Sequence, residues 1–594
     1  MPDYTKKNGS KVADPGVAEY TETVVLRRPP ATPPFPVPVI VGTARTGYPY
    51  NFDTLKKAGE SAYGAFRYVT SDAEAHAMCG VATEIPIAFR NAQEKGLSDC
   101  FLANVAPLTR AQVIVTSAGP VNEFALYSRL FGAIGGHASV KFAAGVFSYK
   151  PVKNFALLSA AVLVTDKRIL VEGQDPDYNP IGWMSPGMTV YLGDNDTPDF
   201  PVVVSATGRD LDATGQWQYY FDLTAATGTA VEVTTKYGCV VLLGEEELST
   251  TFGAGTGQAL VDWINQNCTS FAVQKEATFA GAIPITVAAL TPIKDLAATW
   301  GAITQGTSPV AADADYLAFF PAYEATYWDQ FRNQFNLVPR THLLTASSAI
   351  AHGYAKTFAK ARRAAGSPIQ LILGAAYGAI VLAAVDATNP LVCTAALNNQ
   401  DIDEFFGQFD RLPPALSMAA RAFGMWVSGG SKFSITRKTI KDGTPTITKI
   451  WTAAERKQII QGGGITYMLS PGATPEWQFT SGVSTNQDRA TTWSSASNTT
   501  CMVAARNCID EYRAGLQELL DAYSGLTGIT EADLGSDIYD YNVQSRDKTK
   551  LIREFEPPTL EEDTLEAAWR VTNLSVDPPA ETLFLGIDLL IKVG

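Results

Sequence analysis

The chain has 594 residues, of which 46% are hydrophobic and 18% are charged, and its formal net charge is −14. This composition is typical of a globular protein of about three to five domains and excludes a disordered chain. No run of Lys or Arg is longer than two residues, which excludes the basic surface that nucleic-acid binding requires.

The N-terminal region is predicted to be an extended arm that leads into a first core strand. A short β-rich patch in this arm consists of Thr23, Val24, Val25 and Leu26. Six prolines follow between Pro29 and Pro38. Because proline fixes φ and has no N–H to donate, residues 29–38 are predicted to be a stiff arm and not an interior strand. The first core strand is predicted at Val37 to Val41.

Residues 46–250 are predicted to change from mixed helix and strand to mainly strand. The first elements are helices at Ala73 to Met78 and Ile85 to Lys95, then strands at Asp99 to Val105 and Gln112 to Ser117. Beyond residue 120, short apolar runs alternate with turn signals, which favours a β domain. The strands predicted in that domain are Val162 to Val164, Thr189 to Leu192, Val202 to Ser205, Trp217 to Phe221, Val231 to Thr235 and Cys239 to Leu243.

Beyond residue 255, helices and strands are predicted to alternate again. The helices are Gln258 to Asn265, His352 to Ala364, Ala453 to Gln461 and Thr500 to Tyr523. The last of these has apolar residues at helical spacing along one face, which predicts a long amphipathic helix. The strands are Asp315 to Phe320, Ile369 to Leu373, Phe433 to Arg437, Thr446 to Trp451 and Ile465 to Leu469.

The final predicted element is a strand that runs to the last residues. Alternate positions place one apolar set on a single face, formed by Leu583, Leu585, Ile587, Leu589, Ile591 and Val593. Burial of six such side chains contributes on the order of 10 kcal/mol, and left exposed the strand invites aggregation. It pairs either within its own fold or with a neighbouring subunit's sheet. We predict that this strand and the patch at residues 23–26 link subunits.

The elements predict an α+β or α/β multidomain protein in which a β-rich domain is inserted. The predicted segments are an N-terminal linking arm and first strand at 1–45, an α/β segment at 46–118, a β-rich inserted outer domain at 119–250, an α/β domain at 251–429, and a C-terminal α/β core domain with the terminal linking strand at 430–594. No signal peptide is expected, because residues 1–17 are polar.

No catalytic, metal or cofactor site is predicted. The four histidines, His76, His137, His342 and His352, are scattered and have no metal-ligand spacing. Gly253 to Gly257 precedes a helix but lacks the lysine of a phosphate-binding loop. The seven cysteines lack CxxC spacing, which fits a reducing compartment, and Cys501 and Cys508 are predicted to be buried thiols. Whether any thiol forms an inter-subunit disulfide stays open.

Several short strings, in order, resemble the contractile tail sheath proteins of bacteriophages. They are the hydrophobic run from Pro36 to Ala44 with its Val-Gly end, the Gly464 to Tyr467 step after a helix, the long helix at 500–523, and the Phe-Glu-Pro turn within Ile552 to Pro558. Residues 120–420 do not align with the family. The chain also departs from the family pattern at Val483 to Asn486 and in its strand-like tail after Pro579.

This resemblance implies a structural subunit without enzymatic activity. The subunits would form stacked hexameric rings around a tail tube protein, contact baseplate and tail terminator proteins, and contract to drive the tube through the host envelope. The inner α/β domain would be built from both chain ends, with extended terminal arms. Neither nucleic-acid binding nor direct membrane insertion is implied, and the protein would reside in the virion tail after assembly in the host cytoplasm. The alternatives are another self-assembling virion shell or tail protein and, in a different class, a soluble α/β enzyme.

Overall fold

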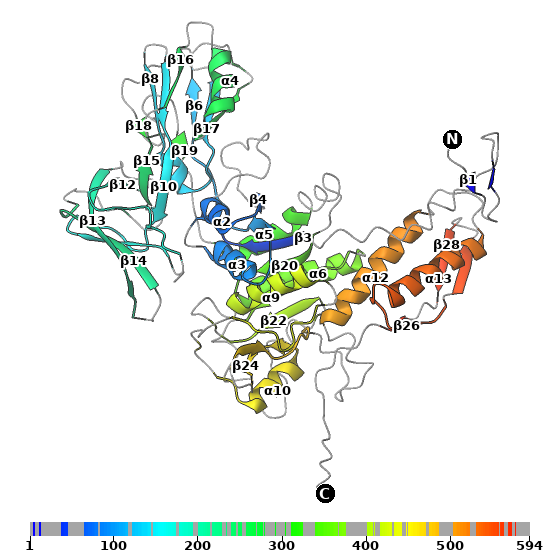
Figure 1. The fold of residues 1–594 in the computed structure, drawn as a ribbon. Helices are drawn as coiled ribbons and strands as arrows, with labels where there is room; N and C mark the ends of the chain where they lie inside the picture. Colours follow the sequence, from blue (N-terminus) through cyan, green and yellow to red (C-terminus); the bar gives the residue numbers. More distant parts are fainter. Residues whose placement is uncertain are drawn as a thin grey trace.

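The fold is known from a computed structural model. It describes residues 4–5, 11–12, 37–45, 65–80, 83–116, 122–143, 146–173, 178–193, 200–213, 217–227, 233, 239–244, 247–251, 257–268, 270–276, 278–279, 291–292, 303–304, 311–324, 339–365, 367–375, 399, 401–407, 409, 416–430, 433–441, 447, 450–470, 475–485, 503–522, 530–557, 559–563, 568–572 and 576–577. Within them the chain is a mixed α/β, multidomain protein (Figure 1).

A seven-stranded sheet forms the centre of the molecule, in the order β23-β22-β21-β20-β3-β5-β4. Its strands are β3 (Val37–Gly42), β4 (Ala65–Val69), β5 (Cys100–Asn104), β20 (Pro339–Leu344), β21 (Gln370–Gly374), β22 (Ile402–Phe405) and β23 (Gly464–Ile465). Neighbouring strands are parallel except for β4, which runs antiparallel to β5. Segments far apart in sequence therefore share one sheet.

Strand β3 lies inside this sheet, between β5 and β20. The prediction that residues 29–38 contain no interior strand is therefore wrong for Val37 and Pro38, which are the first residues of β3. The register between β20 and β3 shifts between Pro339 and Thr341, beside Pro38. Proline is tolerated there because the start of a strand, or a bulge, does not need every ladder hydrogen bond.

Helices cover both faces of the sheet, because alternate strand residues face opposite sides. One face packs Ile40, Leu102, Leu343 and Phe405 against α2 (Asp72–Cys79), α3 (Glu84–Gln93) and α9 (Leu416–Gly429). The other face packs Val39, Val41, Leu371 and Leu373 against α5 (Asp313–Tyr323) and α6 (Ala349–Ala364). Gly424 lets α9 approach α3 closely, since a Cβ there would collide with the carbonyl of Ala92.

Three predicted strands are wrong. Val162 to Val164 is not a strand: only Val162 pairs, in an isolated bridge with Val233, and a turn follows at Val164. Asp315 to Phe320 belongs to helix α5, whose buried residues Tyr316, Phe319, Phe320 and Tyr323 recur at helical spacing. The Asp315 carboxylate accepts a hydrogen bond of 2.7 Å from the Ala312 backbone N–H, which helps the helix to begin there. Phe433 to Arg437 is not a strand but ends in a turn, in which Arg437 has a φ of 62°.

The chain between β5 and α5 forms an inserted β region, which we define as β6 to β19 together with α4. One sheet has the order β17-β7-β6-β19, a second β16-β9-β8-β18, and a third, of six strands, β10-β15-β12-β13-β14-β11. The bounds of these elements are β6 (Gln112–Thr116), β7 (Asn122–Ser128), η1 (Ala133–His137), β8 (Ser139–Ala143), β9 (Val146–Lys150), β10 (Val152–Leu157), β11 (Arg168–Val171), β12 (Thr189–Gly193), β13 (Phe200–Leu211), β14 (Trp217–Leu223), β15 (Cys239–Leu243), β16 (Glu247–Thr251), α4 (Gly257–Asn267), β17 (Phe271–Lys275), β18 (Thr291–Pro292) and β19 (Ile303–Thr304). Figure 1 shows this region projecting from the seven-stranded sheet.

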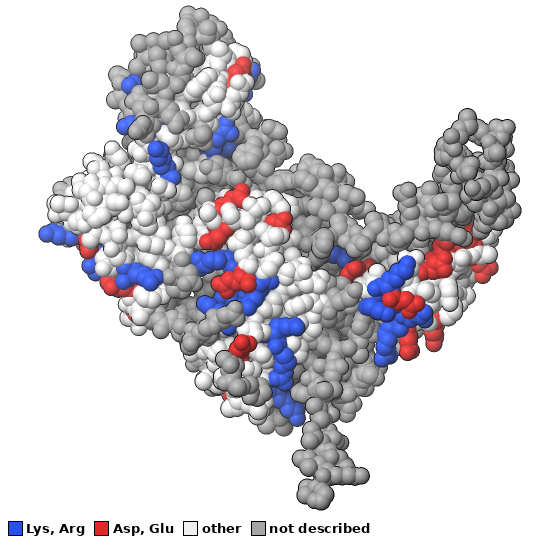
Figure 2. Space-filling view, in the orientation of Figure 1, with Lys and Arg blue, Asp and Glu red and all other residues white. Residues whose placement is uncertain are grey.

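The C-terminal part is a helical hairpin with two small β pairs. Helices α12 (Val503–Ala522) and α13 (Glu531–Asp547) enclose a core that includes Tyr512 and Ile538. The other elements of the chain are β1 (Tyr4–Thr5), β2 (Lys11–Val12), α10 (Ala453–Gly462), β24 (Tyr467–Leu469), β25 (Trp477–Phe479), β26 (Glu554–Phe555), β27 (Thr559–Asp563), β28 (Ala568–Thr572) and β29 (Val576–Asp577). Figure 2 shows acidic and basic side chains next to one another on the C-terminal helices. None of the helices in the described part of the chain combines the length and apolar character of a membrane span.

Candidate functional site: a polar clamp at the amino end of the sheet

The residues predicted to link subunits lie outside the described residues. This holds for the patch at residues 23–26 and for the terminal strand at residues 583–593. Their role therefore stays a prediction. Of the two cysteines predicted to be buried, Cys508 is 1% exposed, as expected, and Cys501 lies outside the described residues.

The β27–β28 hairpin is a described element to which a further strand can be added. Its strands pair antiparallel, from Thr559 opposite Thr572 to Asp563 opposite Ala568. Within the described part of the chain the hairpin is a two-stranded sheet with no third strand. A two-stranded sheet has two edges whose backbone N–H and C=O groups can accept a further strand.

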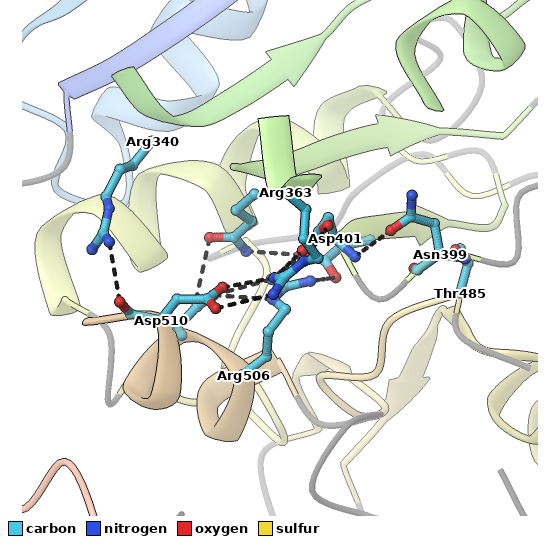
Figure 3. A network of polar contacts seen from close by, with 10 residues as sticks. Arg340, Arg363, Asn399, Asp401, Thr485, Arg506 and Asp510 are labelled. Atoms are coloured by element: carbon cyan, nitrogen blue, oxygen red, sulfur yellow. Dashed lines mark hydrogen bonds and ion pairs between the residues drawn. The ribbon is translucent and has the colours of Figure 1, made fainter. Parts of the chain in front are cut away.

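A network of charged and amide side chains fastens the seven-stranded sheet to helix α12. Strands β20, β21 and β22 are parallel, so their first residues lie together at the amino end of the sheet. Arg340, Gln370 and the aspartates at 401 and 403 lie at this end. Helix α12 brings Arg506, Asn507 and Asp510 to it (Figure 3). We call these residues, with Arg363, the polar clamp.

The innermost contact of the clamp is a bidentate ion pair. Arg506 Nη1 and Nη2 donate hydrogen bonds of 3.0 Å each to the two oxygens of Asp403. The side chains of Arg506 and Asp403 are 4% and 0% exposed, and Gln370 Nε2 donates to the same carboxylate at 2.8 Å. Burial raises the pKa of Asp403, and the Arg506 guanidinium opposes that rise. The pair therefore holds each partner's charge inside the protein.

A second set of contacts joins helix α6 to α12. Arg363, in the last turn of α6, donates from Nε to Asp401 at 2.7 Å and from Nη2 to Asp510 at 3.0 Å. Burial lowers the pKa of Arg363, but the two carboxylates outweigh burial and raise it. Arg340 Nη2 donates to the Asp510 carbonyl at 3.2 Å. The Asn399 side chain accepts from the Asp401 backbone N–H at 2.8 Å, and Thr485 donates to the Asn399 carbonyl at 2.9 Å.

The position of the clamp and the pairing of its charged groups fit a role in holding α12 to the sheet better than a role in catalysis. In open α/β sheets, ligands bind at the carboxyl ends of the strands, whereas the clamp lies at their amino ends. Its charged groups already satisfy one another, as a buried ion-pair network must. The cavity beside it, which Arg340, Gln370 and Trp426 help to line, has a volume of about 60 Å³. That volume is suited to water molecules rather than to a substrate.

The clamp was not predicted from the sequence. The signals were the doublet Arg362-Arg363 at the end of a predicted helix, an Asp-x-Asp pair beside an apolar strand, and Arg506 next to the apolar face of the long helix. Each of these is ordinary on its own. Only the parallel pairing of β21 and β22 brings them to one place.

The four histidines are all buried in the described structure. Their exposed fractions are 1% for His76, 0% for His137, 1% for His342 and 4% for His352. His342 Nε2 lies 2.9 Å from the Tyr323 hydroxyl, and burial lowers the pKa of His342 to about 3. Within the described residues, no group of three or more His, Cys, Asp or Glu side chains could hold a metal ion.

Strand β22 also carries a buried carboxyl group, Glu404. The side chain is 3% exposed, and its Oε2 has no hydrogen-bond partner. Burial raises the pKa of Glu404 from 4.5 to about 8. The folded protein therefore keeps a proton on Glu404 at pH values where the unfolded chain has lost it.

Glu404→Gln should remove a pH-dependent loss of stability. Because the folded-state pKa lies above the unfolded value, the free energy of unfolding falls as pH rises from about 5 to about 8, by about 1.4 kcal/mol per unit. The variant should match the parent at pH 5 and exceed it by a few kcal/mol at pH 9, measured by urea denaturation. The exposed Glu554→Gln is the control. An unchanged pH slope in Glu404→Gln would contradict the assignment.

No family model matches the chain, and no curated protein matches its sequence. Among solved structures, the chain is similar to the sheath tail protein of Listeria innocua, at 11% identity and a TM-score of 0.49, over 94% of each chain. It is also similar to the sheath tail protein of Desulfitobacterium hafniense, at 11% identity and a TM-score of 0.46, over 90% of this chain and 91% of that one.

A third similarity covers less of the chain. A chain of the anti-feeding prophage baseplate matches at 8% identity and a TM-score of 0.33, over 48% of this chain and 76% of that one.

Proposed function

We propose that this chain is the structural subunit of a contractile tail sheath, which polymerises around a tail tube and shortens to drive the tube through a host envelope. The observation that carries the proposal is the two-stranded β27–β28 hairpin, which can accept a further strand, and the sequence predicts a terminal strand with one apolar face that could supply it. The ordered family-like strings between residues 36 and 558 support it.

In this proposal the subunits form stacked hexameric rings. Strand 583–593 of one copy joins the β27–β28 sheet of another by β-augmentation, and the patch at residues 23–26 contributes a second link. The seven-stranded sheet and the C-terminal helices form the inner domain, and the β-rich insertion lies outside it. The proposed boundaries are those of the five segments predicted from the sequence, except that the insertion comprises β6 to β19 as defined above.

The proposed partners are the tail tube, baseplate and tail terminator proteins, and the proposed location is the virion tail, after assembly in the host cytoplasm. Contraction requires subunits that stay linked while their domains reorient. A strand exchanged between copies meets this requirement, because backbone hydrogen bonds hold the strand while the flanking residues turn. The polar clamp would transmit the pull on the C-terminal helices to the central sheet.

Negative-stain electron microscopy of the purified protein tests the proposal. A sheath subunit should form hollow, striated cylinders, since its links join copies head to tail along a helix. Closed shells would favour another self-assembling virion protein, and uniform particles of a few subunits would favour a soluble enzyme. Either of these results would contradict the proposed function.

A further inference from the structure

The inserted β region is connected to the seven-stranded sheet by two chain segments, which we call the neck. The chain leaves β5 and reaches β6 through residues 105–111, and it returns between β19 and α5. At the neck, Ala106 and Leu108 pack against Phe131, with Ala311 beside them. The Gly132 N–H donates to the Thr109 carbonyl at 2.6 Å. This small apolar cluster fixes the root of the insertion.

A second contact, far from the neck in sequence, joins the insertion to the seven-stranded sheet and its helices, which we call the central part. Arg45, just after β3, forms an ion pair of 3.2 Å with Glu172, just after β11. The Arg45 N–H donates to the Cys79 carbonyl at 2.9 Å, so this residue is tied to the end of α2. The two side chains are 13% and 22% exposed, which leaves the pair partly open to water.

An aromatic stack lies at the same junction. The ring of His76, on α2, stacks on Tyr178 with a centroid separation of 3.7 Å and an interplanar angle of 10°. His76 is held by its own helix, since Nδ1 lies 2.8 Å from the Asp72 carbonyl and 3.1 Å from the Asp72 carboxylate. The stack therefore joins the His76 ring, which its own helix holds in place, to the Tyr178 ring of the insertion.

The insertion has cores of its own that do not depend on this junction. The six-stranded sheet packs around residues such as Ile169, Val190 and Phe221. Ala133 and Ile134 pack against Leu157 and Val241, which joins that sheet to the other sheets of the insertion. The insertion can therefore move as one body about its neck.

We propose that Arg45, His76, Glu172 and Tyr178 form a releasable latch, which holds the inserted β region against the central part and lets it swing about the neck when opened. Both contacts are small and formed by side chains alone, and the ion pair is partly open to water, which weakens it relative to a fully buried pair. The latch can therefore open without loss of either core. This inference does not depend on the proposed function, because it concerns two parts of a single chain.

The distance between spin labels on the two parts tests the latch. Lys360→Cys on α6 and Leu211→Cys on β13, both at exposed positions, carry the labels on the full chain, in a background whose accessible native cysteines are serines. The parent should give one narrow distance distribution by double electron–electron resonance. The Arg45→Gln and Tyr178→Ala double variant should give a broader or shifted distribution.

The control is Arg168→Gln, which breaks an ion pair of 2.8 Å with Asp222 inside the six-stranded sheet and does not touch the junction. It should keep the narrow distribution of the parent. Glu172→Gln alone, which keeps size and shape, should broaden the distribution in the same direction as the double variant. A latch variant that keeps the parent distribution while remaining folded by circular dichroism would overturn the proposal.

Discussion

Arg506→Met should lower the free energy of unfolding by about 3–5 kcal/mol, because it leaves the buried Asp403 carboxylate without its partner. Asp403 is 0% exposed, so its charge would stay inside the protein without a positive partner. The remaining donor, Gln370 Nε2, supplies one hydrogen bond but no positive charge. Chemical denaturation, followed by tryptophan fluorescence and circular dichroism at neutral pH, measures the loss.

The matched control for this substitution is Arg513→Met, at an exposed position of the same helix. Surface substitutions of this kind usually change stability by less than about 0.5 kcal/mol. A second variant, Asp403→Leu with Arg506→Met, removes both charges and should recover much of the loss, since apolar replacement of a buried pair is often tolerated. Equal losses in Arg506→Met and Arg513→Met would show that the clamp does not fasten α12 to the sheet.

Deletion of residues 581–594 should abolish polymer formation and leave a soluble, folded protein. The deleted segment carries the predicted strand with its apolar face, Leu583 to Val593, and in the proposed assembly the β27–β28 hairpin would lose the strand that a neighbour supplies. Sedimentation and negative-stain microscopy measure the polymer, and thermal unfolding of the soluble fraction measures the fold.

Deletion of residues 1–35 should likewise abolish polymers without lowering the melting temperature of the subunit.

A control separates the two faces of the terminal strand. Substitution of Leu585, Ile587 and Leu589 by serine should abolish polymers, whereas substitution of Thr582, Asp588 and Lys592 by serine should preserve them. The difference follows from period two, which places only the first set on the apolar face. Cylinders formed by the truncated chain would show that this strand does not link subunits. A large drop in its melting temperature would show that the strand folds into its own subunit.

Elements with a strong local pattern were predictable from the sequence. Strands β5 and β21 and helices α6 and α12 agree with their predictions to within a few residues, because apolar periodicity and turn residues fix such elements locally. Helix α13 was not predicted. Its apolar stripe is short, because Leu534, Ile538 and Tyr541 are followed on the buried face by the polar residues Asn542 and Ser545.

The remaining errors and omissions have two physical causes, an ambiguous local pattern and pairing over long distances in sequence. Helix α5 was predicted as a strand because its residues are apolar on the exposed side as well, where Leu317 is 53% exposed. The clamp joins Arg363, Asp401 and Asp510, which only the order of the parallel strands brings together. The latch likewise joins Arg45 to Glu172 across a domain boundary. No local pattern carries such information.

The central claim is that copies of this chain are joined by β-strands exchanged at their ends, and a helical reconstruction of the assembled polymer by electron cryo-microscopy tests it most directly. The account predicts that residues 583–593 form backbone hydrogen bonds with the β27–β28 hairpin of a neighbouring copy. A map in which those residues pair only with strands of their own subunit would contradict it.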